Sequence, residues 1–110
     1  MADDLTVKEV NTIQSTVDQA GRPLEVGGPA ASGTRRGVGT DLPIGKGEGT
    51  KSDIDYFIPH SSLKHYKGLE GTLPGIDPKT GIIPGNGNPF IGKTIRFEPN
   101  ASPTVIPKAK

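Results

Sequence analysis

Two carboxylates two residues apart, Asp53 and Asp55, are the residues of this sequence best placed to do chemistry. Apolar side chains alternate with polar ones over residues 53–58, and this alternation predicts a strand. Side chains alternate along a strand, so the two aspartates share one face about 7 Å apart, while Ile54 faces the core. Such a pair can bind Mg²⁺, whose charge relieves their repulsion. The alternative is a solvated strand edge with its charges outward.

A glycine turn upstream adds a second chemical signal. The segment 26–34 has the form of a strand that ends at Gly27 and Gly28 and turns into a short helix. Backbone amides at such a turn can hold phosphate oxygens, although the same pattern also occurs in ordinary turns. Arg35 and Arg36 follow the turn, where they can donate to phosphates or serve only solubility.

The two segments together resemble the polymerase-beta-like nucleotidyltransferase superfamily, whose pattern is a strand ending in glycines, a short helix and a strand bearing Asp-x-Asp. The matching residues are 28–33 (Gly-Pro-Ala-Ala-Ser-Gly) and 52–58 (Ser-Asp-Ile-Asp-Tyr-Phe-Ile), and the resemblance covers roughly residues 6–58. The loop between the two motifs is longer than is common in the family. Pro29 stands where the family usually has serine or glycine.

The resemblance implies an Mg²⁺-dependent nucleotidyltransferase that moves a nucleoside monophosphate from an NTP to an acceptor, either RNA or protein. Asp53 and Asp55 would ligate one or two Mg²⁺ ions, and Gly27, Gly28 and Arg35 would bind the phosphates. The family also uses a third carboxylate on a neighbouring strand. Glu98 is the candidate for this catalytic role, with an exposed charge at a strand end as the alternative.

Small domains of this kind also resemble toxin modules at the C-termini of bacterial polymorphic toxins. That context implies a larger secreted chain, a cytoplasmic site of action and an immunity protein as partner.

The elements that must position these residues can be predicted from the apolar pattern. A capping-box pattern at Thr6–Glu9 and an apolar stripe from Val7 to Ala20 predict a helix over 6–20, closed by Gly21. A strand over 23–28 and a short helix over 29–32 should follow. The glycine-dense segment 33–50 is predicted to be a loop. Its residues 37–50 are predicted to be disordered without ligand and to become ordered when Mg²⁺ and NTP bind, with Lys46 as the main new contact.

The second half of the chain predicts fewer elements. After Pro59, which ends the strand, Ser61 or Ser62 can cap a helix of about ten residues, and proline and glycine turns fill 71–88. A last strand is predicted over 94–98, followed by a disordered tail over 100–110. We therefore expect one α+β domain over 1–110, with an ordered core over 6–99, a small mixed sheet, helices on one face and long Gly/Pro-rich loops.

Composition excludes several other classes of protein. The chain has no cysteine, which excludes a disulfide scaffold and a thiolate metal site. A formal net charge of +1 gives no polyelectrolyte signal for nucleic acid or membrane, and no apolar run is long enough for a membrane span. A non-catalytic interaction module that keeps the same fold is the second functional hypothesis. It predicts scattered carboxylates, whereas an enzyme requires Asp53, Asp55 and a third carboxylate to converge.

Overall fold

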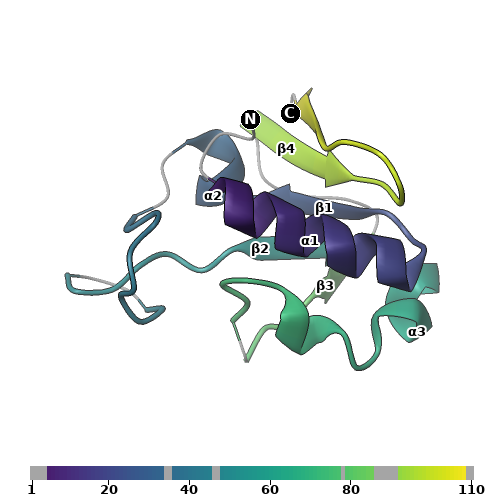
Figure 1. The fold of residues 1–110 in the computed structure, drawn as a ribbon, viewed down its shortest axis with the longest axis horizontal. Coiled ribbons are helices and arrows are strands. Elements are labelled where there is room, and N and C mark those ends of the chain that lie inside the picture. Colours follow the sequence, from purple (N-terminus) through teal and green to yellow (C-terminus); the bar gives the residue numbers. More distant parts are fainter. Residues whose placement is uncertain (1–4, 34–35, 46–47, 78, 86–91, 109–110) are drawn as a thin grey trace.

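The fold was obtained as a computed structural model that describes residues 5–33, 36–45, 48–77, 79–85 and 92–108. Within these residues it is an α+β fold with a mixed five-stranded sheet in the order β3-β2-β1-β4-β5 (Figure 1). None of the described helices is long and apolar enough to cross a membrane. The elements in chain order are α1 (Val7–Ala20), β1 (Leu24–Gly27), α2 (Pro29–Ser32), β2 (Asp55–Ile58), η1 (His60–Ser62), α3 (Leu63–Tyr66), η2 (Glu70–Thr72), β3 (Ile83–Pro84), β4 (Gly92–Phe97) and β5 (Thr104–Lys108).

The central strand β1 is antiparallel to both of its neighbours, β2 and β4. Gly27 lies opposite Asp55 at one end of β1, and Leu24 lies opposite Phe97 at the other end. The edge strands complete the sheet, with β3 parallel to β2 and β5 antiparallel to β4. This register gives the sheet two distinct ends, one at the glycine turn and the other at the end of β4.

Helix α1 begins and ends as the sequence predicts. Thr6 accepts a hydrogen bond from the amide of Glu9 at 3.1 Å, and the Glu9 carboxylate accepts one from the amide of Thr6 at 3.0 Å. Gly21 closes the helix in the left-handed region, with φ 71°. Val7 does not belong to the buried apolar stripe that the sequence predicts, because its side chain is 61% exposed. Val7 therefore faces solvent, whereas Val10 in the same turn packs against the core.

One hydrophobic core joins α1 and α2 to the same face of the sheet (Figure 1). Ile13 and Val17 of α1 and Ala30 and Ala31 of α2 are buried in it. Side chains alternate between the two faces of a strand, so every second residue of the sheet enters this core. These residues are Leu24 and Val26 from β1, Ile54 just before β2, Tyr56 and Ile58 from β2, and Ile95 and Phe97 from β4. Polar residues of the same strands therefore lie on the second face.

Several predicted boundaries need correction. Strand β2 begins at Asp55 and not at Asp53. The second helix is one α-turn, Leu63–Tyr66, and not ten residues, because the backbone leaves helical angles at Lys67, with ψ 124°, and continues into Gly68 with φ 85°. The short strand β3 lies inside the segment predicted to contain only turns.

The predicted disordered tail also needs correction. Residues 104–108 form β5, which pairs with β4 from Arg96↔Thr104 to Gly92↔Lys108. Val105 and Ile106 give this short segment β propensity, but only the partner strand supplies its hydrogen bonds.

Asp18 of α1 fixes the turn between β4 and β5. Its Oδ1 accepts hydrogen bonds from the amide of Asn100 at 2.6 Å and from Nε2 of Gln14 at 2.9 Å. The Asn100 amide, followed by Gln14, lowers the pKa of Asp18. A lowered pKa in the folded state gives stability that is present above the pKa of the unfolded state and lost as the pH falls through the folded value.

We therefore expect Asp18→Ala to lower the free energy of unfolding at pH 7. Urea unfolding at pH 7 and at pH 2 measures the effect, and the difference from the wild type should shrink at pH 2. Asp18→Asn, which keeps an acceptor but not the charge, should fall between the two proteins. A deficit of the same size at both pH values would show that ionisation of Asp18 does not contribute.

Candidate functional site

The candidate site lies where β1 ends and β2 begins. Gly27, the last residue of β1, is paired with Asp55, the first residue of β2, so the register brings the glycine turn beside the aspartates. Asp53 and Asp55 are half-buried, whereas Ile54 between them is buried in the core. The predicted sharing of one face by the two carboxylates agrees with this burial pattern.

The surroundings of Asp55 disfavour the ionised form of its carboxyl group. Burial, together with the negative charges of Asp53 and Asp77, raises the pKa of Asp55 to about 6. No hydrogen bond or ion pair to a basic side chain offsets this repulsion at Asp53 or Asp55 among the described residues. Among the residues that the structure describes, the site is therefore a cluster of negative charge without a basic partner, which a bound cation would relieve.

Asp77 is the third carboxylate of this end of the sheet, and sequence reasoning missed it. It lies in the segment 71–88, where the sequence predicts only proline and glycine turns, and its position depends on a long-range contact. The amide of Ile54 donates to the carbonyl of Gly75 at 2.8 Å, which holds the segment before β3 against the start of β2. Gly75 has φ +63°, and a Cβ there would lie 3.1 Å from Cγ1 of Ile54.

The carboxylate of Asp77 is held by its own turn. Oδ1 accepts from the amide of Lys79 at 2.8 Å and Oδ2 from the Thr80 hydroxyl at 3.2 Å. The Lys79 amide is the main reason that the pKa of Asp77 is lowered. Asp77 therefore stays ionised at neutral pH and adds a fixed negative charge near Asp55.

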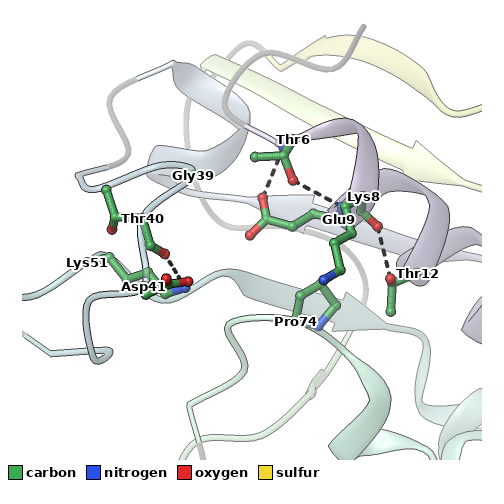
Figure 2. A pocket seen from close by; sticks show the side chains of 9 residues that line it. All are labelled: Thr6, Lys8, Glu9, Thr12, Gly39, Thr40, Asp41, Lys51 and Pro74. Atoms are coloured by element: carbon green, nitrogen blue, oxygen red, sulfur yellow. Dashed lines mark hydrogen bonds between the residues drawn. The ribbon is translucent and has the colours of Figure 1, made fainter.

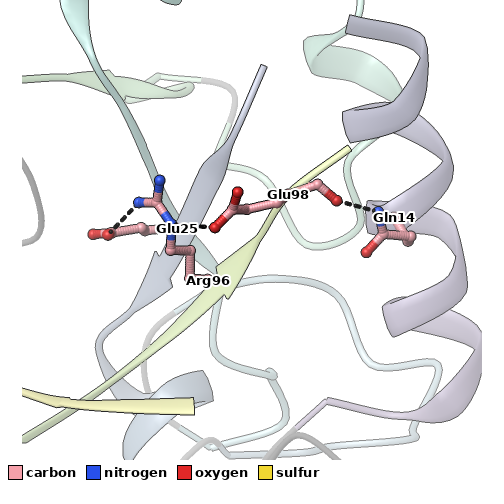
Figure 3. A network of polar contacts seen from close by, with 4 residues as sticks. All are labelled: Gln14, Glu25, Arg96 and Glu98. Carbon is pink, nitrogen blue, oxygen red and sulfur yellow. Dashed lines mark hydrogen bonds and ion pairs between the residues drawn. The ribbon is translucent and has the colours of Figure 1, made fainter. Parts of the chain in front are cut away.

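Glu98 is not part of this cluster. It follows Phe97, which pairs with Leu24 at the far end of β1, about 10 Å along the strand from the Gly27–Asp55 pair. Its carboxylate accepts from Nε of Arg96 at 3.0 Å, and Arg96 also contacts Glu25 at 3.2 Å (Figure 3). The prediction of the face was right, but the register along the sheet places Glu98 in a structural ion-pair network.

That network fastens β4 to α1. The carbonyl of Glu98 accepts from Nε2 of Gln14 at 2.7 Å (Figure 3). The Glu98 hydrogen bond, first among several causes, raises the pKa of Arg96 further above its usual value. These contacts explain the position of Glu98 as structural, without a catalytic role.

The glycine turn has the predicted shape but few free donors. Gly28 has φ 65°, which favours glycine, and its carbonyl accepts from the amide of Ala31 at 3.0 Å. Pro29 has no N–H to offer, and α2 is only one turn long. A phosphate at this turn would depend mainly on the amides of Gly28 and Ala30.

Of the basic side chains after the turn that were predicted to contact phosphates, the structure describes Arg36. Arg35 and Lys46 lie outside the described residues. Arg36 folds back into the glycine loop and not toward the aspartates, since its guanidinium donates to the carbonyls of Thr50 at 3.0 Å and Gly45 at 2.6 Å. The amide of Ser52 also donates to the Arg36 carbonyl at 2.9 Å, which ties the loop to the residue before Asp53.

The described part of the loop has its own hydrogen bonds. Ile44 and Lys51 form a bridge, the amide of Gly45 donates to Lys51, and the amide of Lys51 donates to the carbonyl of Pro43. All of these contacts are internal to the chain. Residues 36–45 and 48–51 therefore have hydrogen bonds of their own, and the ordering of this loop on binding of Mg²⁺ and NTP stays a prediction.

We expect Arg36→Lys to loosen this loop without unfolding the protein. Lysine keeps the charge but loses the planar fork that contacts Gly45 and Thr50 together. Hydrogen exchange of the amides of Lys51 and Ser52 should become roughly tenfold faster, as the loss of about one net hydrogen bond predicts. Glu48→Gln, in the same loop, is the control and should not change it. Equal protection in Arg36→Lys and the wild type would show that the guanidinium does not brace the loop.

A groove of about 350 Å³ opens between this loop and the first turn of α1 (Figure 2). Its lining is polar and carries charges of both signs: Thr6, Lys8, Glu9 and Thr12 from α1, Gly39, Thr40, Asp41 and Lys51 from the loop, and Pro74. Lys51 lies two residues before Asp53, so their Cα atoms are at most about 7 Å apart. The groove is therefore at the same end of the sheet as the aspartates.

The donor set fits a hard cation such as Mg²⁺. Asp53 and Asp55 offer carboxylate oxygens, and Mg²⁺ is usually held by one or two carboxylates together with phosphate oxygens and water. Among the described residues no group of three or more His, Cys, Asp or Glu side chains could hold a metal ion, so Asp77 does not complete a site with Asp53 and Asp55. Asp53 and Asp55 would therefore be the protein ligands, with the remaining positions left to substrate and solvent.

Comparisons with protein families, curated proteins and solved structures found no match. The candidate site therefore stands on its own geometry.

Proposed function

We propose that this chain is an Mg²⁺-dependent nucleotidyltransferase. The observation that carries the proposal is the pairing of Gly27 with Asp55, which places a glycine turn beside two carboxylates that have no basic partner among the described residues. A triphosphate with its cation has the matching charges: phosphate oxygens for backbone amides, and a metal for the carboxylates.

The transfer would join an acceptor hydroxyl to the α-phosphorus of the NTP. The acceptor oxygen forms the new bond, the bond to the β-phosphate bridge breaks, pyrophosphate leaves, and the hydroxyl proton passes to solvent or a nearby base. Mg²⁺ would supply neutralisation of the charge that develops on the phosphate oxygens. Asp53 and Asp55 would hold it, and Gly28 would approach the phosphates through its backbone.

Asp77 takes the place in this proposal that the family resemblance assigned to Glu98. Its lowered pKa makes it a weak base, so its fixed charge suits attraction of a cation better than acceptance of the acceptor proton. Its charge acts on Asp55, but among the described residues the three aspartates do not form a group that could hold a metal ion. A toxin context with an immunity partner remains a proposal from resemblance only.

The reaction class can be tested with labelled nucleotides. Each NTP, labelled with ³²P at either the α or the γ position, is incubated with the protein, Mg²⁺ and cellular RNA or protein as acceptor. Nucleotidyl transfer puts the α label on the acceptor and releases pyrophosphate. Transfer of the γ label would instead show phosphorylation, and transfer of neither label would contradict an enzyme of this class.

A further inference from the structure

We propose that prolines on both edge strands close the sheet to strands of other molecules, so that this chain does not associate through its sheet edges. The edge strands are β3 and β5, and each contains a proline, Pro84 in β3 and Pro107 in β5. The three inner strands, β1, β2 and β4, contain none. A proline has no N–H to offer a neighbouring strand, which is why edge strands tolerate it and central strands do not.

The register of β5 fixes the side on which Pro107 lacks a donor. In an antiparallel pair, the N–H groups of successive residues point alternately toward the partner strand and away from it. Pro107 is paired with Lys93 inside a ladder that continues to Lys108, so its nitrogen occupies an outward position. The residues on either side of Pro107 therefore direct their N–H groups to β4, and Val105 directs its own away from the sheet.

Pro103 removes a second donor from the same edge. It lies two residues before Val105, where the next outward N–H of an extended chain would stand. Of positions 103, 105 and 107, only Val105 has an N–H, so an added strand would find one donor where a regular edge offers three. Val105 is β-branched and 39% exposed, which would otherwise favour association at this edge.

The opposite edge of the sheet has the same protection. β3 is parallel to β2, and the amide of Gly85 donates to the carbonyl of Ile58 at 2.8 Å. The nitrogen of Pro84, one residue before Gly85, therefore lies on the side of β3 that faces away from β2. β3 is also only two residues long, and a short edge strand offers little for another strand to pair with.

The consequence concerns how partners can bind this chain. Addition of a strand to a sheet edge gains its affinity from main-chain hydrogen bonds, and both described edges lack a donor at an outward position. A partner of this chain is therefore expected to contact its side chains and not to extend its sheet. This holds for a second copy of the chain as well, and it does not depend on the reaction proposed above.

The experiment compares the wild type with Pro103→Thr/Pro107→Thr and Pro43→Thr. Threonine restores the N–H and favours a strand. Pro43 is the matched control, because it is exposed but lies in the glycine loop, where its carbonyl accepts from Lys51. Sedimentation is measured from about 10 μM to about 1 mM, the range in which open strand edges associate. Thermal unfolding checks the fold, hydrogen exchange follows the amide of Val105, and Pro107→Thr alone replaces the double variant if that one unfolds.

We expect the wild type and Pro43→Thr to remain monomeric, with rapid exchange at the amide of Val105. The double variant should associate reversibly as its concentration rises, and exchange at Val105 should then become at least tenfold slower. A double variant that stays monomeric at every concentration, or that associates without protection of Val105, would overturn the proposal. So would slow exchange of Val105 in the dilute wild type, because its N–H would then point to β4 and not outward.

Discussion

Replacing Asp55 with asparagine should abolish nucleotidyl transfer and at the same time make the metal-free protein more stable at pH 7. Loss of a metal ligand removes several kcal/mol of transition-state stabilisation, so activity should fall by about 10³-fold or more. The folded state, in contrast, is relieved of a half-buried charge beside Asp53 and Asp77. A rate assay and urea unfolding of the same sample measure the two effects.

The sign of the stability change follows from the pKa of Asp55, which is raised from 3.8 to about 6 in the folded state. A raised pKa gives stability that is fully present below pH 3.8 and lost as the pH rises through about 6. At pH 7 Asp55→Asn should therefore gain about 1 kcal/mol, after allowance for solvent screening of a half-exposed group. At pH 4 the gain should largely disappear. A loss of stability in Asp55→Asn at pH 7 would show that the Asp55 carboxylate makes a favourable contact that outweighs the repulsion.

Substitution of Gly75 should have the second large effect, because this glycine positions Asp77. Gly75→Ala places a Cβ 3.1 Å from Cγ1 and 3.2 Å from Cδ1 of Ile54, which is buried. It also puts an alanine at φ +63°. We expect a loss of about 2–3 kcal/mol of unfolding free energy, from the left-handed backbone and the forced shift of a packed side chain together.

Gly81→Ala separates these two causes. Gly81 has nearly the same backbone angle, φ +64°, but a Cβ there would have no neighbour within 4 Å. It should therefore cost only the backbone part, about 1 kcal/mol. Chemical unfolding of both variants gives the comparison, and transfer activity should fall in Gly75→Ala as the Asp77 segment moves away from Ile54. Equal costs in the two variants would mean that the contact between Gly75 and Ile54 does not hold this segment.

The sequence predicted the parts of the site that depend on local pattern. The capping box at Thr6 and Glu9, the strand ending at Gly27 and the alternation around Ile54 are all properties of neighbouring residues. Their structures follow from short-range physical rules, so the glycine turn and the two aspartates were found without knowledge of the fold.

The third carboxylate could not be predicted in the same way. Both Glu98 and Asp77 lie close to a β-strand, and only the register of the sheet decides which end each one occupies. Asp77 reaches Asp55 through the hydrogen bond between Ile54 and Gly75, 21 residues apart in the chain. The strand β5 was missed for a related reason, since its order depends on pairing with β4.

Mg²⁺-dependent binding of NTPs by titration calorimetry at pH 8 tests the central claim most directly. The account predicts that the wild type binds at least one NTP tenfold or more tightly with Mg²⁺ than without it. Asp53→Asn and Asp55→Asn should lose this dependence, whereas Glu98→Gln, which removes a carboxylate at the other end of the sheet, should keep it. Binding that does not depend on Mg²⁺, or that survives in Asp55→Asn and fails in Glu98→Gln, would contradict the assignment of the site.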